Sequence, residues 1–316
     1  MVKQDSVAMK SKENQLRQYQ STAKRIIKVS IGLLIYVFDE VLGFIKRMMK
    51  IPSPGTSVTI YYHQVSEAER DRFAKQMDHL LRWSQPGRTN ELGSTAPESR
   101  RVIVTADDGW LSFVENALPE LQKRNIPVTM FVVSHRFGDR FGDPVDRLIT
   151  EAELLSLRGE LVTIGSHTAT HARLTAESDL EIQWELHESR ARLSHLLKAD
   201  VRLFCFPFGA HNDESVNLCR SAGYVRAFGA QSTPPAQSAD AFLIERVRVD
   251  PTDWPIEFHL KLMGVYRGVL SAAMLTQQAR AAISAAFSRM ASTVVSRSLQ
   301  DHNARASTDR HPGADF

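Results

Sequence analysis

The apolar positions of the chain follow one pattern before residue 52 and another after it. In the first region, nine apolar positions recur at three- and four-residue spacing: Ile27, Leu34, Val37, Phe38, Val41, Leu42, Ile45, Met48 and Met49. Seven small or charged positions fall on the opposite side: Arg25, Lys28, Gly32, Asp39, Gly43, Lys46 and Lys50. This arrangement predicts an amphipathic helix over residues 24–50, at the end of an otherwise polar N-terminal region, 1–52.

This amphipathic segment is too polar to be a membrane-spanning helix. Such a helix needs about 20 mostly apolar residues, whereas residues 29–38 give only ten uncharged positions before Asp39 and Glu40. We therefore favour a helix that lies in a membrane interface, with its basic ends near anionic headgroups. The alternative is a helix that docks on the folded domain or on a partner, because periodicity does not name what an apolar face contacts.

After residues 52–55, which read Pro-Ser-Pro-Gly and break the helix, short β-rich runs alternate with helical patterns. The expected strands are 57–62, 102–106, 128–133, 161–165, 201–206, 226–228 and 243–248. The expected helices are 67–83, 111–124, 150–157, 177–197 and 213–222, with a further helix-forming stretch over about 255–290. This alternation implies a parallel sheet. We expect a surface loop at 84–100, a catalytic domain over 53–287 and a disordered tail at 288–316.

Polar side chains recur where these strands end. The positions are His63 after the first strand, Asp107 and Asp108 after the second, His167 and His171 after the fourth, Pro207-Phe208-Gly209 after the fifth, and Asp250 and Asp253 after the seventh. Taken singly, each has an ordinary explanation, such as a helix cap or a turn. In a parallel β/α barrel, however, the carboxyl ends of the strands meet at one rim, where reactive groups sit.

One carboxylate and two imidazoles are a suitable ligand set for Zn²⁺, and Co²⁺ or Ni²⁺ would also be accepted. If His167, His171 and one of the two aspartates hold the metal, the other aspartate can take a proton from an activated water. Backbone N–H groups near Phe208 and Gly209 could hold a developing oxyanion. The chemistry implied is metal-assisted hydrolysis of an amide or an ester.

Charge separates the two regions and excludes one class of partner. The chain has 316 residues and a formal charge of +3, but residues 1–50 carry +6 and residues 51–316 carry −3. A nucleic-acid binder is disfavoured, since it needs clustered Lys and Arg on the folded domain. With 43% hydrophobic and 24% charged residues, the composition is globular. Two cysteines, Cys205 and Cys219, are too few for a disulfide framework.

Three short motifs resemble those of the polysaccharide deacetylases with the NodB homology domain, also called carbohydrate esterase family four. Residues 105–109 read Thr-Ala-Asp-Asp-Gly, similar to the first motif of the family, T-F-D-D-G. Residues 167–171, His-Thr-Ala-Thr-His, resemble its second motif, H-S/T-x-x-x-H or a close relative, and residues 206–209, Phe-Pro-Phe-Gly, resemble the third. The start at residues 61–65, Tyr-Tyr-His-Gln-Val, looks like the branch that acts on bacterial exopolysaccharides. The resemblance covers about residues 57–265.

This resemblance implies a fold and a role for each residue. The fold is α/β, a distorted (β/α) barrel of about seven parallel strands. Asp107 would be the general base, while Asp108, His167 and His171 would hold the metal. The backbone N–H of Phe208 would help to bind the oxyanion. The reaction would remove an N-acetyl or O-acyl group from a sugar.

The chain departs from the family pattern at two places that bear on catalysis. Cys205 stands where many members have an arginine that orients the base, and Arg246 or Arg248 could supply the positive partner that keeps Asp107 ionised. No clear Leu-x-His motif, which carries a general acid in many members, occurs near the C-terminus. His63 is our substitute candidate for that acid, against a structural or substrate-contacting role.

The sequence thus predicts a metal-dependent deacetylase that acts on a bacterial surface polysaccharide or its lipid-linked precursor. One alternative is a deformylase or another C–N amide hydrolase of the same fold, because the motifs do not separate acetyl from formyl groups. Another is an inactive glycan-binding scaffold. We expect peripheral membrane association through residues 24–50. The absence of an early signal sequence favours the cytoplasmic face of the inner membrane, with the side left open.

Overall fold

The computed structural model of the chain describes residues 2–51, 55–92, 99–157, 159–230 and 242–265, with side chains from residue 22 onward. They belong to one structural unit, Met1–Val269. The tail expected at 288–316, and the part of the helix-forming stretch 255–290 that follows residue 265, lie outside the described residues.

Seven parallel strands close into a barrel, as the sequence predicts. The eight strands of the sheet are β1 (Thr56–Tyr62), β2 (Gln85–Gly87), β3 (Arg100–Ala106), β4 (Val128–Val132), β5 (Val162–Ser166), β6 (Leu203–Cys205), β7 (Arg226–Ala230) and β8 (Leu243–Arg248). They pair in the order β1-β8-β7-β6-β5-β4-β3, and β3 pairs with β1 along its whole length. Strand β2 is a short addition that pairs with the first half of β3, whereas β4 pairs with the second half.

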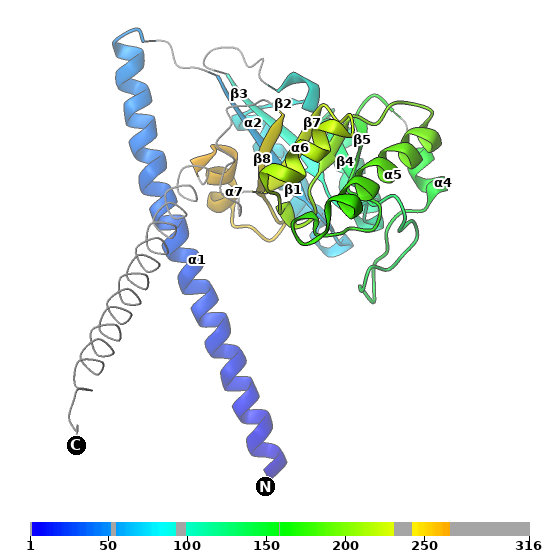
Figure 1. Cartoon of the computed structure of the whole chain (residues 1–316). Coiled ribbons are helices and arrows are strands. Elements are labelled where there is room, and N and C mark those ends of the chain that lie inside the picture. The colour runs from blue at the N-terminus through cyan, green and yellow to red at the C-terminus, as the bar shows by residue number, and fades with distance from the viewer. Residues whose placement is uncertain (1, 52–54, 93–98, 158, 231–241, 266–316) are drawn as a thin grey trace, which may run out of the picture. The chain divides into compact units, whose positions relative to one another are not determined.

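Helices that lie between strands, together with α7 after the last strand, cover the outside of the barrel (Figure 1). They are α2 (Arg70–Trp83), α3 (Leu118–Lys123), α4 (Glu151–Ser156), α5 (Asp179–Leu197), α6 (Asp213–Ser221) and α7 (Pro255–Leu262). Side chains of Thr150, Ser178 and Asn212 accept a backbone N–H at the starts of α4, α5 and α6. The loop predicted at 84–100 is wrong in part, because it contains β2. A Pro86-Gly87 pair is tolerated there because β2 is an edge strand.

A small apolar cluster fills the inside of the barrel. Phe131 on β4 and Phe228 on β7 have ring centroids 5.1 Å apart, although these strands are not neighbours in the sheet. Ile103 on β3 and Cys205 on β6 join the same cluster. Because alternate residues of a strand face the same side, Asp107 follows Ile103 and Thr105 on the inner face. The end of β3 therefore delivers a carboxylate to the mouth of the barrel.

The N-terminal helix α1 (Val2–Met48) is longer than the predicted 24–50. Its small and polar side contacts the folded domain: Arg25 binds Glu257 of α7, and Glu40 binds Arg100 at the start of β3. The apolar side is exposed, with Leu34 73% exposed. Among the described residues, no helix combines the length and apolar character needed to cross a membrane.

Candidate metal and acid–base site

Asp108, His167 and His171 converge at the mouth of the barrel. The Nε2 atoms of His167 and His171 lie 3.3 and 3.2 Å from Oδ1 of Asp108. This oxygen is buried and, apart from the two imidazoles, has no polar partner among the described residues. Burial raises the pKa of the Asp108 carboxyl, but the two imidazoles more than offset this effect, so its pKa lies well below the ordinary value. An ionised carboxylate thus faces two ring nitrogens.

The surroundings of these three residues fit a divalent metal ion. Nδ1 of His167 lies 2.7 Å from the carbonyl oxygen of Cys205. A carbonyl only accepts, so Nδ1 carries a proton, and in the neutral ring this leaves the lone pair of Nε2 on the side of Asp108. The indole N–H of Trp110 donates to Oδ2 of Asp108 at 2.9 Å and orients the carboxylate. A buried oxygen without a donor of its own, set between two imidazoles, matches an Asp-His-His zinc ligand set.

The backbone at this site adopts conformations that residues other than glycine rarely take. Asp108, Thr168, His171 and Phe208 all have positive φ, between 61° and 70°. Such residues cost free energy, of order 1–3 kcal/mol each, and cluster at functional sites. Gly209 is required for a related reason: its φ is 65°, and an added Cβ would lie 2.6 Å from the backbone nitrogen of Ala230. The fold holds the loops that carry Asp108 and His171 in strained conformations, with these two side chains facing each other.

The loop that carries both histidines is tied to α5 through Glu185. The buried carboxylate of Glu185 accepts the backbone N–H groups of Ala169 and Thr170 at 2.7 and 3.0 Å. The hydroxyl of Thr168 accepts the N–H of His171. No sequence pattern marks Glu185 as a site residue, because it lies on a regular helical run. The hydrogen bond from Trp110 to Asp108 likewise depends on the fold and is not marked by the sequence pattern.

Asp107 forms a buried, two-point ion pair with Arg246. The guanidinium donates to Oδ1 at 2.7 Å and to Oδ2 at 2.8 Å. Arg246 is 1% exposed, and its guanidinium carbon lies 4.5 Å from the ring centre of Tyr61. Burial raises the pKa of the Asp107 carboxyl, but the charge and hydrogen bonds of Arg246 outweigh burial and hold it below the ordinary value. Asp107 is therefore ionised at neutral pH and can accept a proton.

Only one of the two candidate arginines reaches the base. Arg246 contacts Asp107, whereas Arg248 is exposed at the end of β8 and makes no such contact. Cys205 lies beside the pair of Asp107 and Arg246: its Sγ is 2.8 Å from Nη2 of Arg246 and 3.8 Å from Oδ2 of Asp107. Burial raises the pKa of this thiol, so it is neutral. A small uncharged residue on β6 thus makes room for an arginine that comes from β8.

His63 and Phe208 lie on the open side of the same site. Nε2 of His63 is 3.9 Å from Oδ2 of Asp108, and its side chain is 35% exposed. The ring of Phe208 packs edge-on against His171 with centroids 4.7 Å apart. Of the two amides considered for the oxyanion, that of Gly209 already donates to the carbonyl of Phe206 at 2.9 Å. This leaves the Phe208 amide as the candidate.

Comparisons of the sequence and of the fold with known proteins lead to the same family. The sequence model described as polysaccharide deacetylase matches residues 94–227. YxkH of Bacillus subtilis (strain 168), which is named after the same family, is 23% identical over 216 residues, covering 64% of this chain and 75% of YxkH. Among solved structures, IcaB from Ammonifex degensii has a TM-score of 0.57 at 23% identity, covering 66% of this chain and 98% of IcaB. That likeness shows a shared fold.

A second relative has a substrate in its name. The poly-β-1,6-N-acetyl-D-glucosamine N-deacetylase of Staphylococcus aureus (strain MSSA476) is 24% identical over 159 residues. The alignment covers 48% of this chain and 54% of the relative, so this chain spans about half the length of that protein.

Proposed function

The resemblance read from the motifs is confirmed, and the chain carries a polysaccharide deacetylase domain; from this premise we propose that it is a metal-dependent hydrolase that removes N-acetyl groups from a saccharide. The observation that carries the proposal is the pairing of two adjacent carboxylates with different partners. Asp108 faces His167 and His171, while Asp107 is held by Arg246. One carboxylate is thereby suited to bind a cation and the other to accept a proton.

In this proposal Asp108, His167 and His171 hold a divalent ion, and Zn²⁺ is the ion that we favour. When bound, such an ion polarises an acyl carbonyl and lowers the pKa of water. Asp107 accepts the proton of the attacking water, because Arg246 keeps it ionised and fixes both of its oxygens. The Phe208 N–H donates to the oxyanion. His63 is close enough to the ligand set, and open enough to solvent, to donate a proton to the leaving amine.

The substrate in this proposal is an N-acetylated polysaccharide or its lipid-linked precursor. The named substrate of the staphylococcal relative, a poly-N-acetylglucosamine, supports an N-acetyl sugar polymer. The helix α1 supports the proposal that the chain acts at a membrane. The domain contacts the side of α1 that carries Arg25, Tyr36 and Glu40. The opposite side exposes 12 large apolar residues between Ile26 and Met48. A lipid surface would cover this side and leave the docked side unchanged.

A substrate panel tests the function. The zinc-loaded full chain is incubated with N-acetylated and N-formylated sugar oligomers and with lipid-linked N-acetyl sugars, and released acid is identified by mass. We expect acetate from the N-acetyl substrates, released about a thousandfold more slowly by an Asp107→Asn chain, while an Asp71→Asn chain, altered at an exposed aspartate of α2, retains the parent rate. Formate as the main product would point to a deformylase. No acid from any substrate, with metal bound, would favour the glycan-binding scaffold.

A further inference from the structure

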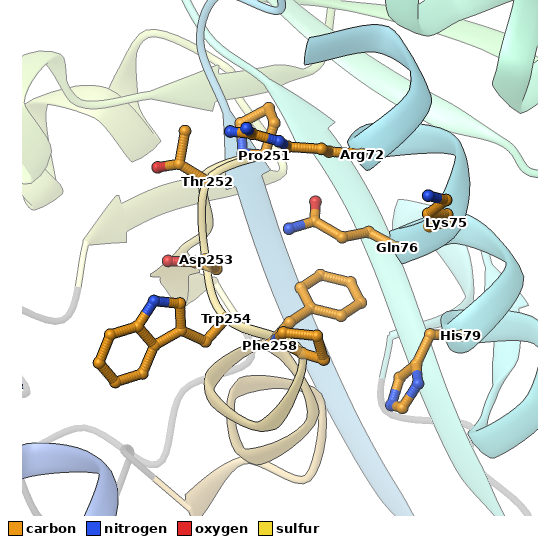
Figure 2. A pocket seen from close by; sticks show the side chains of 10 residues that line it. Arg72, Lys75, Gln76, His79, Pro251, Thr252, Asp253, Trp254 and Phe258 are labelled. Carbon is orange, nitrogen blue, oxygen red and sulfur yellow. The ribbon is translucent and has the colours of Figure 1, made fainter. Parts of the chain in front are cut away.

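A second cavity lies on the outside of the barrel, between α2 and the segment that follows β8. Its volume is about 460 Å³. One wall is a single face of α2 with Arg72, Lys75, Gln76 and His79, and the other is the loop 251–255 with Phe258 of α7. Figure 2 shows the two walls facing each other, with the indole of Trp254 turned away from α2. None of these residues belongs to the site at the mouth of the barrel.

The floor of this cavity consists of apolar side chains and of one amide group that already has its hydrogen-bond partners. Phe258 is buried, and Pro251 and Pro255 add apolar surface. The amide of Gln76 accepts from the hydroxyl of Tyr62 and donates to the carbonyl of Asp250, both at 2.8 Å. The floor therefore offers no polar group that still needs a partner, and it suits a hydrocarbon segment.

The rim of the cavity carries positive charge without a matching carboxylate. Within the described part of the chain, neither Arg72 nor Lys75 has an ion-pair partner, although Arg70 on the same helix binds Glu120 at 2.8 Å. The one acid of the lining, Asp253, is neutralised by Lys261 at 2.6 Å. Two like charges three residues apart on a helix repel each other unless an anion lies between them. The rim is thus arranged for an anionic group.

The loop that forms the second wall is also the place where α1 is held. Arg25 donates to the carbonyl of Thr252 at 3.0 Å, and its guanidinium lies 4.5 Å from the ring centre of Trp254. Nε of Arg25 binds Glu257 at 2.7 Å. The cavity therefore adjoins the helix whose exposed apolar side we assign to a lipid surface. A molecule anchored in that surface would have its polar headgroup close to the cavity.

We propose that this cavity binds the phosphate headgroup of a membrane amphiphile, with the phosphate between Arg72 and Lys75 and the first apolar carbons over Phe258. The amphiphile is either an anionic phospholipid or the lipid carrier of a sugar, which share this chemistry. This inference rests on the proposed membrane contact only for the source of the ligand, and not for its binding to the cavity. Binding of a soluble amphiphile tests the cavity without a membrane and without turnover.

The experiment measures binding to the full-length Asp107→Asn chain by calorimetry, in phosphate-free buffer. The probes are inorganic phosphate, farnesyl phosphate and dihexanoyl phosphatidylglycerol. We expect both amphiphiles to bind more tightly than inorganic phosphate, and R72A/K75A to weaken them more than about tenfold, since hydrogen bonds to charged groups are lost. The matched control, R82A/K123A, removes one arginine and one lysine from exposed positions outside the cavity and should bind as the parent does.

The probes also separate the two sources of the headgroup. Tighter binding of farnesyl phosphate identifies a polyprenyl sugar carrier, and tighter binding of dihexanoyl phosphatidylglycerol identifies a phospholipid. Equal affinities of the parent and of R72A/K75A for both amphiphiles would overturn the proposal, as would a parent chain that binds neither amphiphile more tightly than inorganic phosphate. Because no step requires hydrolysis, a failed deacetylase assay leaves this result unaffected.

Discussion

The mouth of the barrel and the exposed side of α1 reverse the usual burial of side chains in two different ways: the mouth buries charged groups, and α1 exposes apolar ones. At the mouth, Asp107, Asp108 and Arg246 are buried, 1–6% exposed, in a region where charges are expensive. Along α1, Leu34 and Phe38 are 73% and 62% exposed, where apolar groups are usually covered. The first region has nearly all of its partners within the chain, whereas the second has none for its apolar side among the described residues. The first therefore indicates chemistry, and the second indicates a surface outside the molecule.

The largest effect should come from breaking the proposed metal ligand set. Replacing His171 by Asn keeps a residue that tolerates the positive φ of this position but removes the imidazole. Lewis-acid stabilisation is worth several kcal/mol, and each 1.36 kcal/mol corresponds to a tenfold change in rate. We expect activity to fall by several decades, to the level of the chelator-treated parent. Elemental analysis should show less than one metal per chain; full metal content in H171N would remove this residue from the ligand set.

The next effect concerns the proton acceptor alone. Asp107→Asn should lower kcat by about three decades, because a positioned general base contributes about 10²–10⁴-fold. Metal content should remain at the parent value, since Asp107 is held by Arg246 and not by the metal ligands. The comparison of H171N with D107N thus separates the two carboxylate roles. A D107N chain with unchanged turnover would show that another group accepts the proton.

Arg246→Gln tests how the base is kept ionised. Loss of the guanidinium removes the group that holds the Asp107 pKa down, so burial should raise that pKa and move the acidic limb of kcat/KM to higher pH. In the parent, the pKa of Asp107 is lower in the folded chain than in the unfolded chain, where it is about 3.9. This difference stabilises the fold at pH values above the unfolded pKa, and the stabilisation is lost as the pH falls through the folded pKa. Breaking the buried pair should also cost about 3–5 kcal/mol. Arg248→Gln is the matched control, because this arginine is exposed; an equal shift in both variants would contradict the assignment.

The same two arginines show where sequence reasoning ends. Alternation along β8 places Arg246 and Arg248 on the same face, so the pattern alone does not choose between them. The choice depends on register: Arg246 is paired with Ala230 of β7, whereas Arg248 is the last residue of β8 and is paired with Tyr61 of β1. The parallel sheet was predictable from the alternation of strand and helix runs, whereas its closure into a barrel was implied only by the family resemblance. The positive φ of Asp108 and His171 was not, since no residue preference at those positions requires it.

Breaking the exposed side of α1 should affect membrane binding and little else. Leu34→Glu with Phe38→Glu places two charges on that side. If both side chains enter lipid, each contributes about 1.5–3 kcal/mol, so partitioning to phosphatidylglycerol vesicles should fall about a hundredfold or more. The melting temperature should hardly change, because exposed positions have small effects on stability. The control V145E/L180E alters two other exposed apolar residues, 89% and 79% exposed, and should bind vesicles as the parent does. Equal partitioning of both double variants would assign the apolar side to another partner.

The smallest effect should come from the docked side of the same helix, and it decides whether α1 and the barrel act as one body. Arg25→Ala removes the contact with Glu257 but leaves Lys261 at 3.6 Å from that carboxylate, so the loss is partly compensated. We expect a cost of about 1–2 kcal/mol, because Arg25 is partly exposed. Trypsin should cleave between residues 24 and 50 faster in R25A than in the parent, while vesicle binding stays at the parent level because the apolar side is unaltered. If R25A also lost vesicle binding, the docked orientation of α1 would be part of how the chain meets the membrane, and the two sides of the helix could not be treated as independent.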